Sequence, residues 1–288
     1  MAKPDAVSLD HIGIVGQNQG KLEQTFAALG FTVAPRCEQM SVNDDGTTTP
    51  LGQSNCHMIF NDTYVELTSV HGNLENHHLR DAIARYYGFH IVVLRTPDAH
   101  TSQAGLASQS MAVAPVVTAA REVNYPNNKG TAGFDWFRVP ESDLPEAFVC
   151  YMEHKTKELC FDSALANHAN GASDLVGITL CSADAPLAAR RFAAATGGRI
   201  DQDGTAQMVS LPAGGIVRCV DPAGLDERFP GINVAPLPWA AAFTLKSHDL
   251  ALSRAWFESK GIKVAGDKDR FWLMPDQAEG AAIEFVGG

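Results

Sequence analysis

Two histidines stand at matching places in two apolar segments of the chain. His11 lies in residues 9–15 and His90 lies in residues 88–94, and each segment opens a repeated unit. An imidazole can bind a metal ion or exchange a proton near neutral pH. A single histidine in an apolar strand is more often a hydrogen-bonded core residue. Two at equivalent positions of a repeat favour a shared chemical role.

Two other polar residues are candidates for handling a substrate. Alternation along residues 55–60 places His57 on the face opposite to Met58, where it could act as an acid–base group or hydrogen-bond a substrate. The alternative is a surface histidine on an edge strand. Arg138 follows an aromatic stretch and could hold an anionic substrate group, although a surface ion pair would also explain it.

A third segment, residues 147–154, presents several candidate substrate contacts on one face. Period-two alternation puts Phe148, Cys150 and His154 on the same side of a strand. In contrast, the neighbouring histidines His77 and His78 lie in a polar loop with no spacing typical of a zinc site. We expect that pair to be solvated.

Composition restricts the class of protein. A net charge of -11 argues against a nucleic-acid partner, which would require clustered Lys and Arg. The six cysteines show no paired spacing typical of metal or disulfide motifs. Residues 1–5 contain no apolar signal core, and no apolar run approaches the roughly 20 residues that span a bilayer. These features predict a soluble cytoplasmic protein with no membrane partner.

The candidate residues must be positioned by a unit that recurs four times. An apolar strand leads into a helix of about three turns, and further strands follow. Copies open at residues 9–15, 88–94, 175–180 and 241–245. Apolar spacing predicts helices over residues 21–29, 101–110, 185–196 and 250–260. Residues 167–173, polar and Gly-containing, are the best linker between two halves.

The remaining strands of each unit are shorter apolar runs bounded by turn residues. The sequence predicts strands over residues 31–34, 55–60, 64–70, 133–139, 147–152, 207–211, 216–220, 262–265, 271–274 and 282–286. The period of the unit is longer than the about 20–50 residues of solenoid repeats. The chain therefore contains duplicated supersecondary modules.

Four such modules resemble the vicinal-oxygen-chelate superfamily, which includes glyoxalases, extradiol dioxygenases, epimerases and related antibiotic-resistance proteins. Residues 9–15 (Leu-Asp-His-Ile-Gly-Ile-Val) and 64–67 (Tyr-Val-Glu-Leu) are similar to its first- and last-strand motifs. The first half in particular looks like a glyoxalase-like domain. The resemblance implies an α+β fold of four βαβββ modules forming two cupped mixed sheets. It implies an N-terminal module pair (residues 1–166) and a C-terminal pair (residues 174–288).

The resemblance also implies where metal ligands would come from, namely the first and last strands of paired modules. In the N-terminal pair these places hold His11, Glu66 and His90, with Cys150 or His154 as a further ligand. A shift of one residue in the second module would turn His90 to the other face. The C-terminal pair offers no histidine there, and Glu284 is expected to be structural, paired with an Arg or Lys.

Two histidines and one carboxylate match the facial triad of non-heme iron oxygenases. Fe²⁺ is the metal that we expect first, with Zn²⁺, Mn²⁺ or Ni²⁺ as alternatives. The favoured function is ring-cleaving dioxygenation of a small oxygenated molecule. A glyoxalase-type lyase or isomerase and a metal-free binding protein are the alternatives, followed by a metal-free enzyme with His57 as base. The sequence leaves open whether the cups close within one chain or in a homodimer.

Overall fold

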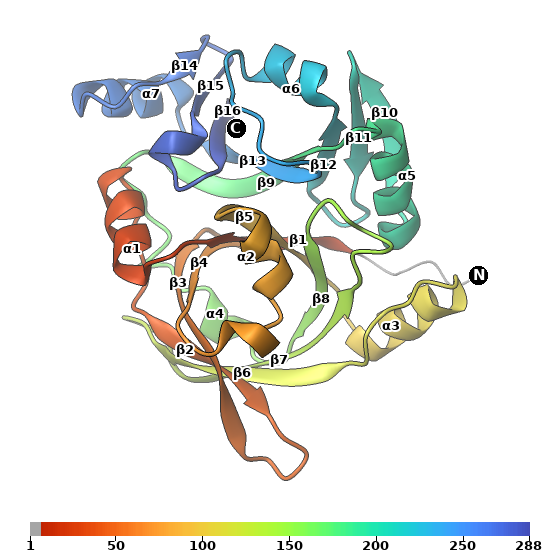
Figure 1. Ribbon diagram of the computed structural model, residues 1–288. Helices are drawn as coiled ribbons and strands as arrows, with labels where there is room; N and C mark the ends of the chain where they lie inside the picture. Colours follow the sequence, from red (N-terminus) through yellow and green to blue (C-terminus); the bar gives the residue numbers. More distant parts are fainter. Residues whose placement is uncertain (1–6) are drawn as a thin grey trace.

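The computed structural model describes residues 7–288, and the predicted absence of a signal in residues 1–5 falls outside them. The chain forms two eight-stranded mixed sheets with few helices, which confirms the predicted α+β architecture (Figure 1). The first sheet closes into a barrel in the order β1-β4-β3-β2-β6-β7-β8-β5, whereas the second stays open in the order β10-β11-β12-β9-β13-β16-β15-β14. One chain therefore closes the first cup without a second copy.

Each sheet is built from a pair of modules. The barrel strands are β1 (Ser8–Val15), β2 (Cys37–Val42), β3 (Thr48–Ile59), β4 (Tyr64–Val70), β5 (Gly88–Arg95), β6 (Val117–Asn124), β7 (Lys129–Val139) and β8 (Phe148–His154). The open sheet contains β9 (Ala172–Cys181), β10 (Arg199–Asp203), β11 (Ala206–Ser210), β12 (Ile216–Val220), β13 (Trp239–Ser247), β14 (Ala265–Gly266), β15 (Arg270–Leu273) and β16 (Ala282–Gly287). First and last strands of a module pair in parallel, as β1 does with β4.

The helix of every module begins in the same way. These helices are α1 (Gln19–Ala28), α3 (Ala99–Ser108), α5 (Ala185–Thr196) and α7 (Leu250–Ser259). Asn18, Asp98, Asp184 and Asp249 cap them, each accepting a hydrogen bond from the backbone N–H three residues later. Shorter helices connect the modules, namely η1 (Leu74–Asn76), α2 (Arg80–Arg85), α4 (Lys157–Cys160) and α6 (Pro222–Arg228), while η2 (Pro275–Gln277) lies inside the fourth module.

Several strand predictions differ from the structure. Residues 31–34 are not a strand: Ala34 donates one backbone hydrogen bond to His57, and Pro35, which has no N–H, delays the ladder until Cys37. Strands β2, β6 and β10 were not predicted, and the strand predicted over residues 262–265 is replaced by the two-residue β14. Strand β10 is short of apolar residues, and pairing with neighbouring strands rather than local pattern sets β2, β6 and β10 in the sheets.

The barrel and the open sheet share one apolar core. Buried side chains from β1, β4 and β5 join those of β9 and β13 in a continuous cluster. The two halves also meet backbone to backbone, since a Cβ on Gly88 would lie 2.8 Å from the carbonyl oxygen of Gly280. The barrel therefore packs closely against the second half. Within residues 7–288, no helix has both the length and the apolar character required to cross a bilayer.

Candidate active site in the barrel

A small chamber occupies the middle of the barrel, between two apolar plugs. Leu79 and Ile83 pack against Ile91 and Phe148 at one end, and a cluster containing Phe161 fills the other. The chamber has a volume of about 80 Å³. It is lined by His11, Gln39, Leu51, Gln53, Tyr64, Glu66, His78, Ile91, Val93, Ala119, Phe134, Trp136, Phe148, Cys150 and Met152. Most of its wall is apolar, with polar groups at a few points.

His11 is fixed by its neighbour in the chain. A β-bulge interrupts the β1–β5 ladder between Leu9 and His11, which leaves Asp10 without a direct partner on β5. Bulges re-aim side chains, and here the carboxylate of Asp10 reaches the imidazole of His11, with Oδ1 2.6 Å from Nδ1. Because Nδ1–H donates to Asp10, the lone pair of His11 is on Nε2. Its ring also stacks on Tyr64 at 4.1 Å.

Asp10 is the centre of a buried charge cluster. Its Oδ2 accepts hydrogen bonds from Arg95 at 2.5 Å and from His154 at 2.9 Å. Burial alone would raise the pKa of Asp10, but the charge of His154 and the hydrogen bonds from both histidines hold that pKa well below its usual value. Burial likewise lowers the pKa of His154, yet the charge of Asp10 outweighs it and raises this pKa to about 9. At neutral pH the carboxylate is ionised and His154 is protonated.

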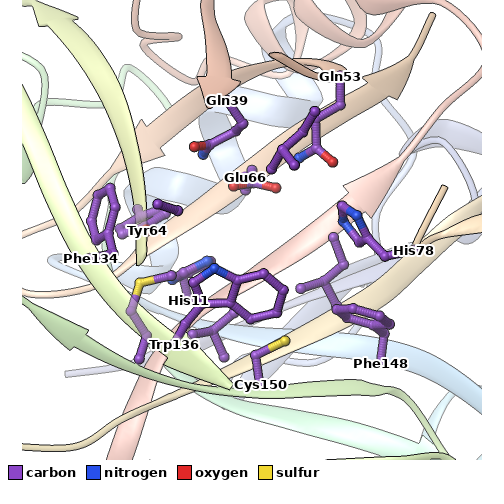
Figure 2. A pocket seen from close by; sticks show the side chains of 15 residues that line it. His11, Gln39, Gln53, Tyr64, Glu66, His78, Phe134, Trp136, Phe148 and Cys150 are labelled. Carbon is purple, nitrogen blue, oxygen red and sulfur yellow. The ribbon is translucent and has the colours of Figure 1, made fainter. Parts of the chain in front are cut away.

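Glu66 faces the same chamber from β4, next to β1. Gly13 pairs with Glu66 in the parallel ladder, so the carboxylate lies one pleat along from His11. Thr68 donates to its Oε1 at 2.5 Å, and Nε2 of His57 lies 3.9 Å from its Oε2. Figure 2 shows Glu66 with Gln39 and Gln53 on one side of the chamber and Trp136, Cys150 and Phe148 on the other. His11 and Glu66 thus meet in one site, as the resemblance implied.

His57, the predicted acid–base residue, lies behind Glu66 and does not line the chamber. It is fully buried, and its Nδ1 lies 3.3 Å from the hydroxyl of Tyr125. Burial lowers the pKa of His57 well below its usual value, and the charge of Arg121 lowers it further. A direct role in substrate chemistry does not agree with this position.

His90 is not brought together with His11 and Glu66. Its Nε2 donates to the carbonyl oxygen of Tyr86 at 2.7 Å, and its ring stacks on that residue at 3.9 Å. Burial lowers the pKa of His90 to about 4. Ile91 and Val93 face the chamber from β5 instead, so the second module is displaced by one residue relative to the alignment that paired His90 with His11.

The residues present therefore do not form the expected facial triad. The β5 position that corresponds to His11 holds Ile91, and the β8 position that corresponds to Glu66 holds Cys150. Burial raises the pKa of the Cys150 thiol above its usual range, which disfavours the thiolate that binds metals. Within residues 7–288, no group of three or more His, Cys, Asp or Glu side chains is placed to hold a metal ion.

The predicted substrate contacts divide into two groups. Phe148 and Cys150 line the chamber. Arg138 does not line it, but its guanidinium lies 4.4 Å from the ring centre of Phe148 and pairs with Glu141 at 3.2 Å. His154 continues the face of Cys150 but turns to Asp10 instead. These two residues support the site from behind its wall.

One functional candidate was assigned wrongly to a solvated loop. His78 lines the chamber, where it packs against Phe148 at 5.6 Å and Trp136 at 6.3 Å. Burial, with a contribution from His77, lowers its pKa to about 3. The signal that could have placed it is Leu79, an apolar residue that anchors this loop in the barrel.

Glu284 in the open sheet has the structural role predicted for it. Its carboxylate accepts hydrogen bonds from Arg228 at 2.7 Å, Arg270 at 3.0 Å and Thr244 at 2.8 Å. The side chain is fully buried. The charge is satisfied on several sides, as expected for a structural carboxylate.

Comparisons with known proteins agree with this architecture. The profile of the glyoxalase-like domain family matches residues 9–196. A hypothetical protein from Staphylococcus aureus has a TM-score of 0.69 at 11% identity, covering 98% of this chain and 100% of the other. A mutant of 4-hydroxymandelate synthase from Streptomyces coelicolor has a TM-score of 0.59 at 8% identity, covering 98% of this chain and 92% of the other.

A third similar structure is a xylose isomerase-like TIM barrel/4-hydroxyphenylpyruvate dioxygenase fusion protein. It has a TM-score of 0.59 at 9% identity, covering 99% of this chain and 50% of the other. No curated protein matches the sequence significantly. At such identities the structures share the fold alone. The chain has the vicinal-oxygen-chelate fold, and it belongs to the glyoxalase-like domain family.

Proposed function

We propose that the barrel is the active site of an enzyme that moves a proton on a small carbonyl compound, a lyase or isomerase of the glyoxalase type. The Asp10–His11 pair carries this proposal. A carboxylate that accepts from Nδ1 of a histidine fixes the ring tautomer and stabilises the imidazolium that forms when Nε2 takes a proton. His11 is such an imidazole, and it lines the chamber.

The chamber supplies the remaining groups. His11 Nε2 removes a proton from the hydroxyl-bearing carbon next to the substrate carbonyl and later returns it to the former carbonyl carbon. The hydroxyl proton passes through the carboxylate of Glu66 to the former carbonyl oxygen. Gln39 and Gln53 donate to the oxygen on which negative charge develops, and Glu66 orients a substrate hydroxyl. Tyr64 holds the ring of His11 from behind.

The size of the chamber favours this reaction over ring cleavage. A dry cavity of about 150 Å³ binds benzene, whereas this chamber has a volume of about 80 Å³. A catecholic ring is larger than benzene and would have to extend through the open side of the chamber, whereas a substrate with about three carbons fits within it. The protein ligands for iron are also incomplete, with Ile91 at the third position. Both observations disfavour the ring-cleaving dioxygenase that the sequence led us to expect.

The experiment is proton exchange in D₂O, followed by NMR, with hydroxyacetone, lactaldehyde and methylglyoxal as probes. We expect deuterium to enter the carbon next to the carbonyl in the presence of the protein. His11→Gln should reduce this rate by about 10²-fold or more. His90→Gln is the matched control because His90 lies outside the chamber, and it should retain the rate.

Elemental analysis of protein purified without added metal is the measurement that could contradict this proposal. About one equivalent of metal that disappears in His11→Gln would contradict the role of His11 as the base and return support to metal-dependent chemistry. Tight binding of a small probe without any exchange would instead favour the binding-protein alternative.

A further inference from the structure

A second site of distinct character is centred on Arg121 in β6. This side chain is 1% exposed, and its Nε has no hydrogen-bond partner in the part of the chain that the structure describes. Its Nη1 donates to the hydroxyl of Tyr125 at 2.8 Å, and its guanidinium lies 5.8 Å from the ring centres of Tyr125 and Phe134. Among residues 7–288 no carboxylate forms an ion pair with it. A guanidinium is always charged, so burial without a counter-charge is costly.

A cavity in the barrel wall borders Arg121. Strands β2 and β6 pair only at Met40–Ala120 and Ser41–Ala119. Beyond these pairs the strands separate and leave a cavity of about 460 Å³, within the size range of small-ligand sites. Arg121 and Tyr125 lie in its wall together with Cys37. The cavity is separate from the His11 chamber, whose lining does not include these residues.

The charged groups at the rim of this cavity already have partners. Arg36 pairs with Glu23 at 2.8 Å. Glu38 accepts from Ser54 at 2.6 Å and lies 2.9 Å from His71. Glu122 accepts from Thr131 at 2.6 Å. None of them neutralises Arg121, and the two rim carboxylates disfavour a ligand that carries more than one negative charge.

We propose that this cavity binds a small monocarboxylate, whose carboxylate enters between β2 and β6 and pairs with the guanidinium of Arg121. The planar fork of an arginine matches the two oxygens of a carboxylate. The apolar body of the ligand lies toward Pro35 and Met40 in the outer part of the cavity. This site is independent of the reaction proposed for His11.

A chain of polar contacts gives the site its own spectroscopic signal. Tyr125 accepts from Arg121, so its hydroxyl proton points to Nδ1 of His57 at 3.3 Å. A carboxylate that draws Arg121 away from Tyr125 therefore changes the hydrogen bond received by His57. The ¹⁵N shifts of the His57 ring report binding at Arg121 without any mutation.

The test is titration of the whole protein with benzoate, followed by calorimetry and by the ¹⁵N spectrum of His57. Uncharged benzamide and inorganic phosphate serve as comparison probes. We expect saturable benzoate binding that shifts the His57 signals and at least tenfold weaker binding of the other two. Benzoate binding that leaves the His57 signals unchanged, or phosphate binding tighter than benzoate, would overturn the proposal.

Variants locate the site within the barrel. Arg121→Gln should abolish benzoate binding, and Arg121→Lys should restore part of it. Arg36→Gln, in the same cavity but already paired, and His11→Gln, in the other chamber, should both keep it. Loss of binding in His11→Gln with retention in Arg121→Gln would place the ligand in the active-site chamber and contradict the proposal. If Arg121→Gln does not fold, benzoate binding by Arg121→Lys and the His57 signals of the parent protein test the proposal instead.

Discussion

The carboxylate of Asp10 and the imidazole of His11 are neighbours in the chain, yet they meet inside the barrel at 2.6 Å. Successive side chains of a regular strand point to opposite faces, so this contact exists only because β1 is bulged at Asp10. The bulge therefore turns two consecutive residues into one acid–base unit.

Asp10→Asn should uncouple this unit. The substitution keeps the shape of the side chain but removes the charge that stabilises a protonated His11. We expect proton exchange on the small carbonyl probes to slow by about 10²-fold, measured per folded molecule after correction by thermal unfolding. Asp62→Asn is the matched control, because Asp62 also binds Arg95 but is exposed and does not contact His11. Equal losses in both variants would count against a specific role for Asp10.

The His154–Asp10 pair makes stability depend on alkaline pH. The pKa of His154 is about 9 in the folded protein against about 6.5 when unfolded. The folded state therefore holds a proton that the unfolded state releases. The stabilisation that the His154–Asp10 pair contributes is complete below pH about 6.5 and is lost as the pH rises through about 9. We expect the free energy of unfolding to fall by at most about 3 kcal/mol across that window.

Urea unfolding at several pH values between these limits measures the slope. His154→Gln should flatten it, since the variant has no proton to release there. His71→Gln, which alters an exposed histidine paired with Glu38, should leave the slope as in the parent protein. If the slope persists in His154→Gln, the loss of stability at alkaline pH comes from another group.

The fold could be predicted further than the site, for a physical reason. Helix α5 was predicted at its observed bounds from its end at Gly197, and Asp184 and Pro186 also mark its start locally. Strand β4 was also predicted at its bounds, because it is apolar and Asn61–Asp62 form the turn before it. Such signals depend on a few adjacent residues, and the structure confirms them.

The face of a strand depends on register, which local sequence does not determine. His11 and His90 both lie in apolar strands, but the β1–β5 ladder is irregular at Asp10 and again after Gly13. In the observed register Ile91, and not His90, occupies the place that corresponds to His11. His78 was missed for a related reason: a loop that looks solvated in the sequence folds back over the barrel.

Glu284 offers a test of the structural role of the second half. Its buried carboxylate pairs with Arg228 and Arg270, so Glu284→Gln leaves two cations without a counter-charge. We expect a loss of about 3–5 kcal/mol in the free energy of unfolding, measured by urea denaturation. Asp203→Asn, which alters the exposed partner of Arg218, should cost less than about 1 kcal/mol. A small loss in both variants would contradict the role of Glu284.

Ile91→His tests the register directly, because it would place an imidazole at the position where the resemblance implied a ligand. With His11 and Glu66 it would complete two histidines and one carboxylate around the chamber. We expect the variant to bind about one equivalent of Co²⁺, visible as absorption bands that the parent protein lacks. Ile91→Asn, which adds polarity without a strong ligand, is the control. If the parent protein binds Co²⁺ as tightly as Ile91→His, or if His90→Gln abolishes binding in the parent, then His90 faces the chamber and the assigned register is wrong.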